Sequence, residues 1–247
     1  MRFDEDTLYV TDLDGTLLGK DARIPQKAVE MLNEMMDSGL PFTVATARSW
    51  ASAGPIVKPL HLTLPAVAFN GAFLVDPQSG AALDQCLFSA EQAREIASVY
   101  FAHGLSPLVY AKVGWQEKVS WLRAIEYDGI RAYAAKRKGD PRLRPVERED
   151  ELFEGEIFYL SMLGSHEMLD PLEKIVRQLP FVHVSFTFDA YQPELNWLEL
   201  SRTDATKAKG VEKLRRMTGK SRIVCFGDNL NDLPMFRVAD ECYAVAN

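Results

Sequence analysis

The sequence lacks long apolar segments, is poor in cysteine and has no run of basic residues. No apolar stretch approaches the about 20 residues that a membrane-spanning helix needs. The cysteines Cys86, Cys225 and Cys242 are odd in number and show no Cys-x-x-Cys spacing, so we expect reduced, mostly buried thiols rather than a disulfide framework. With 28 Lys and Arg against 35 Asp and Glu, the net charge is −7. This balance argues against nucleic acid or an anionic membrane surface as the main partner.

The first residues, Met-Arg-Phe-Asp-Glu-Asp, are acidic where a targeting segment would be basic and then apolar. We therefore expect a cytoplasmic protein without a signal peptide. The 247 residues, 47% of them apolar, are enough for one large domain or two smaller ones with packed cores.

The most informative stretch is 7–17. A short apolar run of strand formers ends at Asp12 and Asp14, after which Gly15 permits a sharp turn. Two carboxylates held this close repel each other, which indicates a bound cation or a proton-transfer role. Taken alone, Asp-Gly is also a common hairpin turn, so the interpretation depends on partners elsewhere. A calcium loop is excluded because Arg23 stands where its bidentate Glu would be.

The first eighty residues alternate between strand and helix patterns. The expected elements are the strand before Asp12, a helix between Pro25 and Gly39, a strand over 41–47 and, after a segment interrupted by Pro and Ser, a strand over 66–69. This order predicts an α/β layer with a parallel sheet, in which ligands bind beyond the carboxyl ends of the strands. Asp12, Thr46 and Asn70 all fall at such ends.

The middle of the chain has a different pattern of expected strands and helices, which predicts a separate α+β domain. Its signals are a capping box at Ser89 and Gln92, a strand over 108–113, helical spacing over 168–176 and alternation over 182–188; the charged segment 137–150 is interpreted as a surface loop. The alternation of strands and helices resumes with an expected strand over 197–200, a helix over 207–217 and a strand over 222–226. This last strand ends in Gly-Asp-Asn-Leu-Asn-Asp. We expect a core domain of 1–82 and 190–247 with 83–189 inserted.

Four separated motifs fall at predicted strand ends or a helix start: Asp12-Leu13-Asp14-Gly15-Thr16-Leu17, Thr46-Ala47-Arg48, Lys207, and Gly227-Asp228-Asn229-Leu230-Asn231-Asp232. In this order they resemble the motifs of the haloacid dehalogenase superfamily of phosphotransferases. The position of the inserted domain and Phe69-Asn70-Gly71-Ala72 resemble its Cof-like phosphatases. The resemblance implies a Rossmann-like parallel-sheet core with an inserted α+β cap domain.

The resemblance also implies a Mg²⁺-dependent phosphatase of small phosphorylated metabolites, most plausibly sugar phosphates, that works through an aspartyl phosphate. The resemblance implies Asp12 as the nucleophile and Asp14 as the acid and base, with Asp12, the carbonyl of Asp14 and Asp228 as the metal ligands. It implies that Thr46 and Lys207 contact the phosphoryl oxygens, and that Asp232, with Asn231 beside it, orients Lys207 or a ligated water. Arg48, Asn70 and Gly71 are the implied substrate contacts. Lys209 is a rival for the lysine role, although spacing to Leu214 favours Lys207.

Two other functions stay open at this point: a phosphomutase of the same superfamily and a non-catalytic metabolite-binding protein. The family usually continues past a final Asn-Ala, whereas this chain stops at Ala246-Asn247, so another subunit is a candidate cover for the sheet edge. The expected state is a monomer or homodimer. In the inserted domain, the candidates for sugar stacking or anion contact are Trp115, Trp121, Arg123, Tyr127, Arg131 and Tyr133, although such aromatics are more often core residues.

Overall fold

The computed structural model describes residues 3–114, 116–189, 192 and 194–246, and they form two compact units. The core unit comprises residues 1–86 and 204–247, and the inserted unit comprises 87–203. Among the described residues, no helix has both the length and the apolar character needed to cross a membrane.

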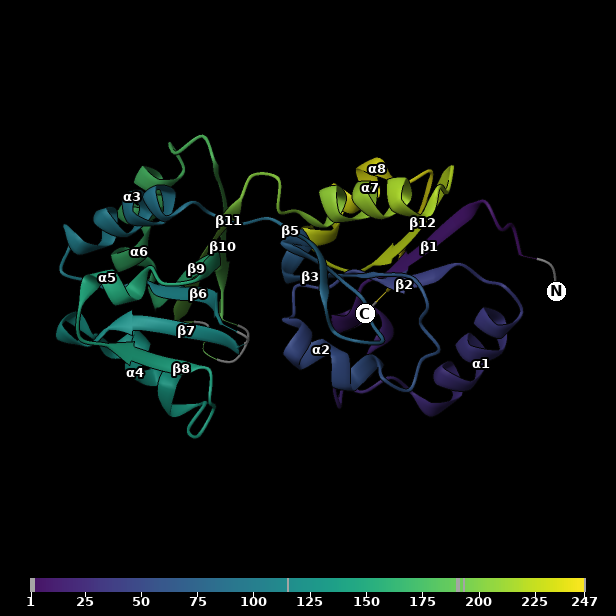
Figure 1. Cartoon of the computed structure of the whole chain (residues 1–247), viewed down its shortest axis with the longest axis horizontal. Coiled ribbons are helices and arrows are strands. Elements are labelled where there is room, and N and C mark those ends of the chain that lie inside the picture. Colours follow the sequence, from purple (N-terminus) through teal and green to yellow (C-terminus); the bar gives the residue numbers. More distant parts are fainter. Residues whose placement is uncertain (1–2, 115, 190–191, 193, 247) are drawn as a thin grey trace. The chain divides into compact units, whose positions relative to one another are not determined.

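The core unit is built on a parallel sheet in the order β13-β12-β1-β2 (Figure 1). Its strands are β1 (Thr7–Thr11), β2 (Phe42–Val44), β12 (Arg222–Gly227) and β13 (Glu241–Ala244). β3 (Ala66–Ala68) joins β2 through a parallel bridge, and continues into the antiparallel strands β4 (Phe73–Val75) and β5 (Ala82–Gln85). The predicted α/β class with a parallel core sheet is therefore confirmed.

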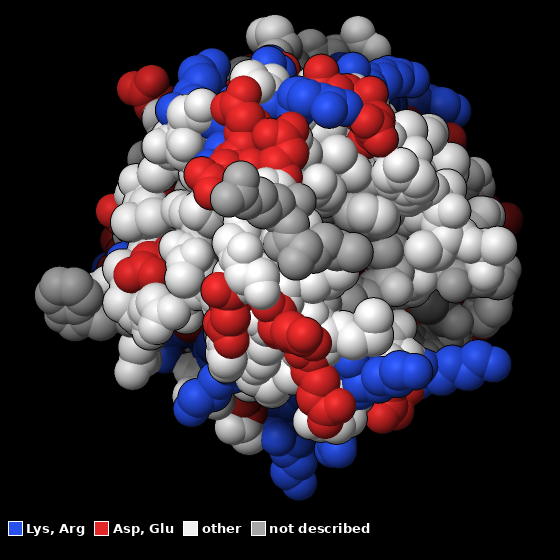
Figure 2. Space-filling model, turned by 90° about the vertical axis from the view of Figure 1, so that its right-hand side faces the viewer, with Lys and Arg blue, Asp and Glu red and all other residues white. Residues whose placement is uncertain are grey.

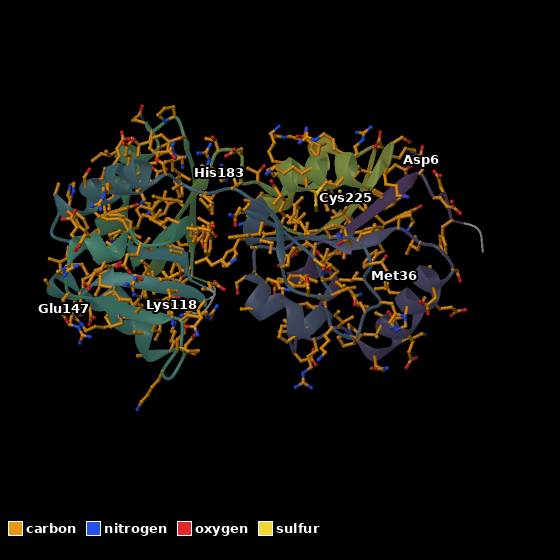
Figure 3. The ribbon with its side chains drawn as sticks, in the orientation of Figure 1. Asp6, Met36, Lys118, Glu147, His183 and Cys225 are labelled. Atoms are coloured by element: carbon orange, nitrogen blue, oxygen red, sulfur yellow. The ribbon has the colours of Figure 1, made fainter. Side chains whose placement is uncertain are left out.

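Helices cover both faces of this sheet. α7 (Lys207–Thr218) and α8 (Leu233–Val238) lie on one face, while α1 (Gln26–Asp37) and α2 (Trp50–Val57) lie on the other (Figure 1). Burial on both faces explains why the strands read as continuous apolar runs rather than as alternating ones. Cys225, labelled in Figure 3, is one of the buried side chains of β12. On the face of the molecule shown in Figure 2, most Asp and Glu side chains lie in two groups, one above and one below the middle of the view, in keeping with the acidic net charge.

The inserted unit contains a mixed sheet in the order β10-β11-β9-β6-β7-β8. The strands are β6 (Leu108–Val113), β7 (Gln116–Leu122), β8 (Leu143–Val146), β9 (Glu156–Ser165), β10 (Val182–Phe188) and β11 (Leu195–Arg202). α3 (Ala90–Phe101) and α6 (His166–Val176) share the larger hydrophobic core with one face, α4 (Asp128–Ala135) packs on the other, and α5 (Glu149–Leu152) follows β8. The predicted capping box at Ser89 is present, with both hydrogen bonds formed.

Two parts of the inserted unit differ from the sequence interpretation. The segment 137–150 is not only a loop, because it contains β8, which runs parallel to β7 at the edge of the sheet. An edge strand tolerates Pro145, whose missing N–H would break a ladder bond in a central strand. The strand at 197–200 belongs to β11, which pairs with β10 and β9 rather than with the core sheet. The units accordingly divide after residues 86 and 203, where the sequence suggested 82 and 189.

Candidate active site

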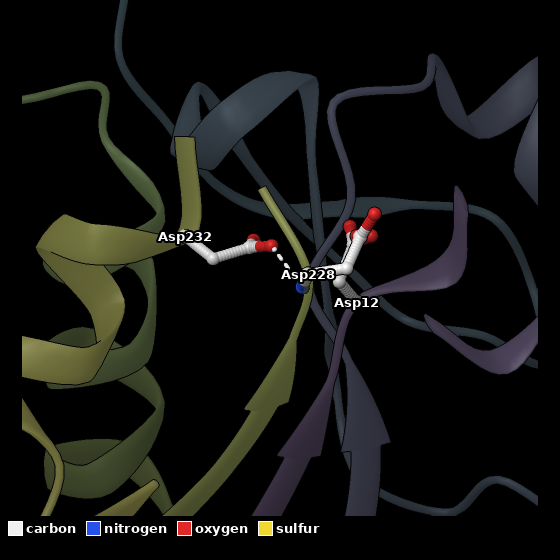
Figure 4. A group of neighbouring side chains, drawn as sticks. All are labelled: Asp12, Asp228 and Asp232. Carbon is white, nitrogen blue, oxygen red and sulfur yellow. Dashed lines mark hydrogen bonds between the residues drawn. The ribbon is translucent and has the colours of Figure 1, made fainter. Parts of the chain in front are cut away.

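The site lies at the carboxyl ends of the core strands. Asp12 directly follows β1, and its N–H donates to the carbonyl of Phe226 on β12 at 2.9 Å. Asp228 directly follows β12, and its side chain comes close to that of Asp12 (Figure 4). Parallel strands end at one edge of a sheet, so residues more than two hundred positions apart in the chain become neighbours.

Lys207 is the buried cation of the site. Its ammonium donates to Oδ1 of Asp12 at 2.5 Å and to Oδ1 of Asp232 at 2.6 Å, and its side chain is 0% exposed. The rival Lys209 is exposed and pairs with Glu212 on its own helix at 2.9 Å. The difference follows from helix geometry, since positions two residues apart lie on opposite sides of a helix.

Asp232 is the second carboxylate that binds the Lys207 ammonium. While Oδ1 accepts from the ammonium, Oδ2 accepts from the N–H groups of Asp228 and Asn229, each at 3.1 Å (Figure 4 shows the first). The carboxylate is 0% exposed, and its hydrogen bonds offset the cost of burying its charge. Both oxygens are thus engaged, which suits Asp232 to orienting Lys207 rather than to ligating a metal ion.

Burial raises the pKa of Asp12 to about 6, although the neighbouring Lys207 ammonium acts in the opposite direction. A carboxylate taken out of water is less stable in its charged form, and one ammonium shared between two carboxylates does not fully compensate. Any additional cation at this position would therefore favour the ionised, nucleophilic form of Asp12.

The residues present fit a hard divalent cation. Carboxylate oxygens of Asp12 and Asp228 lie within 4.8 Å of each other and of Asp232, and oxygen is the donor that Mg²⁺ prefers. Asp12 and Asp228 are the candidate ligands, because both oxygens of Asp232 already accept hydrogen bonds. Gly15 keeps this space open: it has φ +75°, and a Cβ built on it would lie 2.2 Å from Oδ2 of Asp228. The hydroxyl of Thr16, which the sequence interpretation gave no role, donates to Oδ1 of Asp228 at 3.1 Å.

Arg48 and Asp14 form a two-pronged ion pair. Nε of Arg48 donates to Oδ2 of Asp14 at 2.7 Å, and Nη2 donates to Oδ1 at 2.6 Å. Such a fork matches carboxylate geometry, and it matches the oxygens of a phosphoryl group equally well. The structure thus places Arg48 against Asp14, a contact that the sequence interpretation did not anticipate.

Thr46 and Asn70 are joined through the backbone at the ends of β2 and β3. The N–H of Asn70 donates to the carbonyl of Thr46 at 3.0 Å, and the Thr46 hydroxyl accepts from the N–H of Arg48 at 3.1 Å. Asn70 has φ +52°, a strained value for a residue with a side chain, and its buried Oδ1 has no hydrogen-bond partner among the described residues. Gly71 lies against the start of α7, because a Cβ on it would be 2.1 Å from the carbonyl of Thr206.

The structure does not bring every predicted residue together. Asn231 is exposed on the helical turn Leu230–Asp232, outside the hydrogen-bonded cluster around Lys207. Asp232 directly precedes α8, and the other proposed residues of the core unit lie in the segments that follow β1, β2, β3 and β12 or at the start of α7.

The chain is similar to known proteins over nearly its whole length. A family model described as haloacid dehalogenase-like hydrolase matches residues 9–247. An HMP-PP phosphatase of Serratia proteamaculans is 25% identical, covering 97% of this chain and 84% of that protein. The 5-amino-6-(5-phospho-D-ribitylamino)uracil phosphatase YitU of Bacillus subtilis is also 25% identical, covering 97% and 86%.

Among solved structures, TM0651 from Thermotoga maritima superposes with a TM-score of 0.76 at 25% identity, covering 96% of this chain and 85% of that one. The family match, the named relatives and the shared fold agree with the motifs at the strand ends. The chain belongs to the haloacid dehalogenase-like hydrolases and is a phosphatase of their Cof-like group.

Proposed function

We propose that the protein is a Mg²⁺-dependent phosphatase of small phosphorylated metabolites, with sugar and sugar-alcohol phosphates as the preferred class, and that Asp12 is its nucleophile. The observation that carries the proposal is the buried Asp12–Lys207–Asp232 chain, which aims a carboxylate and an ammonium at the edge where parallel-sheet proteins bind ligands. The substrate in the name of the relative YitU carries a phosphorylated ribityl chain, which is a sugar-alcohol phosphate.

In this proposal the Asp12 carboxylate attacks phosphorus and forms an aspartyl phosphate while the bond to the leaving oxygen breaks. Asp14 gives its proton to that oxygen, so the leaving group departs as a neutral alcohol. Asp14 then takes a proton from a water molecule that attacks the aspartyl phosphate, which releases inorganic phosphate and restores the Asp12 carboxylate.

The remaining residues position and neutralise the phosphoryl group. Lys207 balances charge on Asp12 and on the phosphoryl oxygens, and Asp232 keeps the ammonium in place. Thr46 offers its hydroxyl proton to a phosphoryl oxygen. Asp14 must carry a proton to act as an acid, and a protonated carboxyl group binds a guanidinium only weakly. Arg48 therefore leaves Asp14 when substrate binds and donates to the phosphoryl oxygens instead.

Asp12, the carbonyl of Asp14 and Asp228 would hold Mg²⁺. When bound, the ion would supply positive charge that offsets the repulsion between the carboxylates and an anionic substrate and that stabilises the phosphoryl oxygens. Asp14 would contribute its carbonyl, since its side chain has the acid and base role.

The test is phosphate release from a panel of sugar and sugar-alcohol phosphates and a generic aryl phosphate, with Mg²⁺ or with a chelator. Asp12→Asn is the control because it keeps the size of the side chain and a hydrogen bond to Lys207. We expect Mg²⁺-dependent release that Asp12→Asn reduces by about 10⁴-fold or more. Turnover that persists in folded Asp12→Asn would remove Asp12 as nucleophile, and sugar bisphosphate as product would indicate a mutase.

A further inference from the structure

Cys225 and Cys242 lie opposite each other on two neighbouring strands of the core unit. In the parallel pairing of β12 with β13, these two residues are partners in the register. Neighbouring strands lie about 4.8 Å apart, and the Cα atoms of two cysteines joined by a disulfide are usually about 4.4–6.8 Å apart. The backbone spacing of this pair therefore suits a disulfide, although both thiols are free in the structure.

The two side chains point to the same face of the sheet. Side chains alternate along a strand, and the next pair in the register, Phe226 and Tyr243, stacks its rings on the opposite face with 5.3 Å between the ring centroids. Cys225 shares a buried hydrophobic cluster with residues of α7 and α8. Cys242 follows the same alternation, so its thiol is directed to the face on which Cys225 lies.

The two thiols differ in their access to solvent. Cys242 is exposed on β13, which stands at the edge of the described sheet, whereas Cys225 is 0% exposed. Burial, and after it the charge of Cys242, raises the pKa of Cys225 to about 12, so this thiol keeps its proton at neutral pH. An oxidant in solution therefore reacts with Cys242 first. Local opening of the edge strand is the movement that brings its sulfur to Cys225.

The segment between the two cysteines carries part of the candidate active site. Residues 226–241 include Asp228, Asp232 and α8. The charges of Asp232 and Lys207 also act on the pKa of Cys225, which places this thiol near the buried ion pair. A bond between the cysteines would close the segment into a covalent loop, and such a loop stabilises the folded state mainly by restricting the unfolded chain.

We propose that Cys225 and Cys242 form a reversible disulfide when the protein meets a peroxide, and that this bond holds β13 on β12 and stabilises the segment that carries Asp228 and Asp232. The inference does not depend on the proposed phosphatase function, because it concerns only the thiols and the stability of the core unit.

The oxidation takes place in two steps. The Cys242 thiolate first attacks one oxygen of hydrogen peroxide; the O–O bond breaks, a sulfenic acid forms, and the departing hydroxide takes up the proton that Cys242 released. The sulfur of Cys225 then attacks the sulfenic sulfur; the S–O bond breaks, the S–S bond forms, and the hydroxide leaves as water with the proton of Cys225. The two thiols together lose two electrons, and the peroxide is reduced to two water molecules.

The test treats the full chain with hydrogen peroxide in the presence of a chelator, blocks the remaining thiols and maps the cysteines by mass spectrometry without reduction. We expect one intramolecular bond between Cys225 and Cys242, seen as the loss of two hydrogen atoms, and its removal by a dithiol reductant. The midpoint of thermal unfolding of the oxidised protein should lie about 5 °C or more above that of the reduced protein.

Cys242→Ser removes the exposed thiol, so peroxide should form no disulfide in this variant and should not raise its midpoint of unfolding. Cys86→Ala is the matched control. Cys86 directly follows β5, in another sheet, so this variant should form the disulfide and show the same rise as the wild type.

The inference fails if Cys225 stays free after peroxide treatment, whether Cys242 is unchanged, oxidised to an acid or linked to a second molecule. It also fails if the disulfide forms but the midpoint of unfolding stays the same or falls. An equal rise in Cys242→Ser would show that peroxide stabilises the protein by another route, and would overturn the role of the disulfide.

Discussion

The buried ammonium of Lys207 allows the sharpest test of how the site is held together. Replacing it by Met keeps the length and apolar stem of the side chain but leaves Asp12 and Asp232 buried without their shared cation. Removing one partner of a buried, hydrogen-bonded ion pair typically costs about 3–5 kcal/mol, most of it from the charge left behind. We expect a loss of that size from the free energy of unfolding of the core unit at pH 7.

Lys209→Met provides the comparison. This lysine lies on the same helix, carries the same charge and forms an exposed pair with Glu212, so its removal should cost no more than about 0.5 kcal/mol. The two variants are compared by urea unfolding in the presence of a chelator, with the slope of each transition checked against that of the wild type. Equal stabilities of the two variants would refute the assignment of Lys207 as the buried cation.

The destabilisation by Lys207→Met should also depend on pH in a defined direction. Without the ammonium, the pKa of Asp12 in the folded protein lies further above its unfolded value, so the folded state binds more protons than the unfolded state as the solution is acidified. The free energy of unfolding of Lys207→Met then rises as pH falls from about 7 to 5, and its difference from that of the wild type becomes smaller. Adding Asp12→Asn to Lys207→Met should recover part of the loss at pH 7, and a gap that widens on acidification would contradict the argument.

Three further outcomes follow from the core unit. Gly15→Ala would place a Cβ 2.2 Å from Oδ2 of Asp228, so we expect weaker Mg²⁺ binding, measured by titration, and a loss of about 1–3 kcal/mol from backbone strain. In Gly71→Ala the new Cβ would clash with the backbone at the start of α7, so this variant should have a lower midpoint of thermal unfolding than Gly39→Ala. Gly39 has a similarly positive φ, but a Cβ built on it would have nothing within 4 Å. In chelator, the wild type should lose stability relative to Asp12→Asn as pH rises from about 4 to 6, by on the order of 3 kcal/mol, because the pKa of Asp12 in the folded protein, about 6, lies above the ordinary aspartate pKa of 3.8. Parallel curves of stability against pH would count against that raised pKa.

The strand ends of the core could be predicted because their signals are local. A buried parallel strand reads as a short apolar run, and the polar residue that ends it is the residue that reaches the ligand edge. Asp12 follows β1 and Asp228 follows β12, and the structure places both next to each other. The pairing of Arg48 with Asp14 had no such signal, since spacing in the sequence does not indicate which carboxylate a long side chain will meet.

The inserted unit was harder to predict because its contacts are long-range. Periodicity indicated a strand at 197–200, but not that it would pair with β9 and β10. Of the six side chains suggested for ligand contact, Tyr133 lines a cavity of this unit, whereas Trp121 is buried and donates to Glu126. Tyr127 is also part of the hydrophobic core, and Arg123 and Arg131 form ion pairs with Glu147 and Asp128. Trp115 lies outside the described residues.

The charges at the strand ends are the physical reason for the divalent cation that we propose for this site. The carboxylates are Asp12, Asp14, Asp228 and Asp232, and the neighbouring cations are Lys207 and Arg48. This set carries more negative than positive charge, and a phosphate monoester dianion would increase the excess. The proposed divalent ion, held by oxygen ligands, would reduce the repulsion with and without substrate, and because its ligands come together only in the folded protein it would also raise the free energy of unfolding. In the proposed mechanism, the negative charge that would make Asp12 a nucleophile is thus the same charge that the ion would offset in the folded protein.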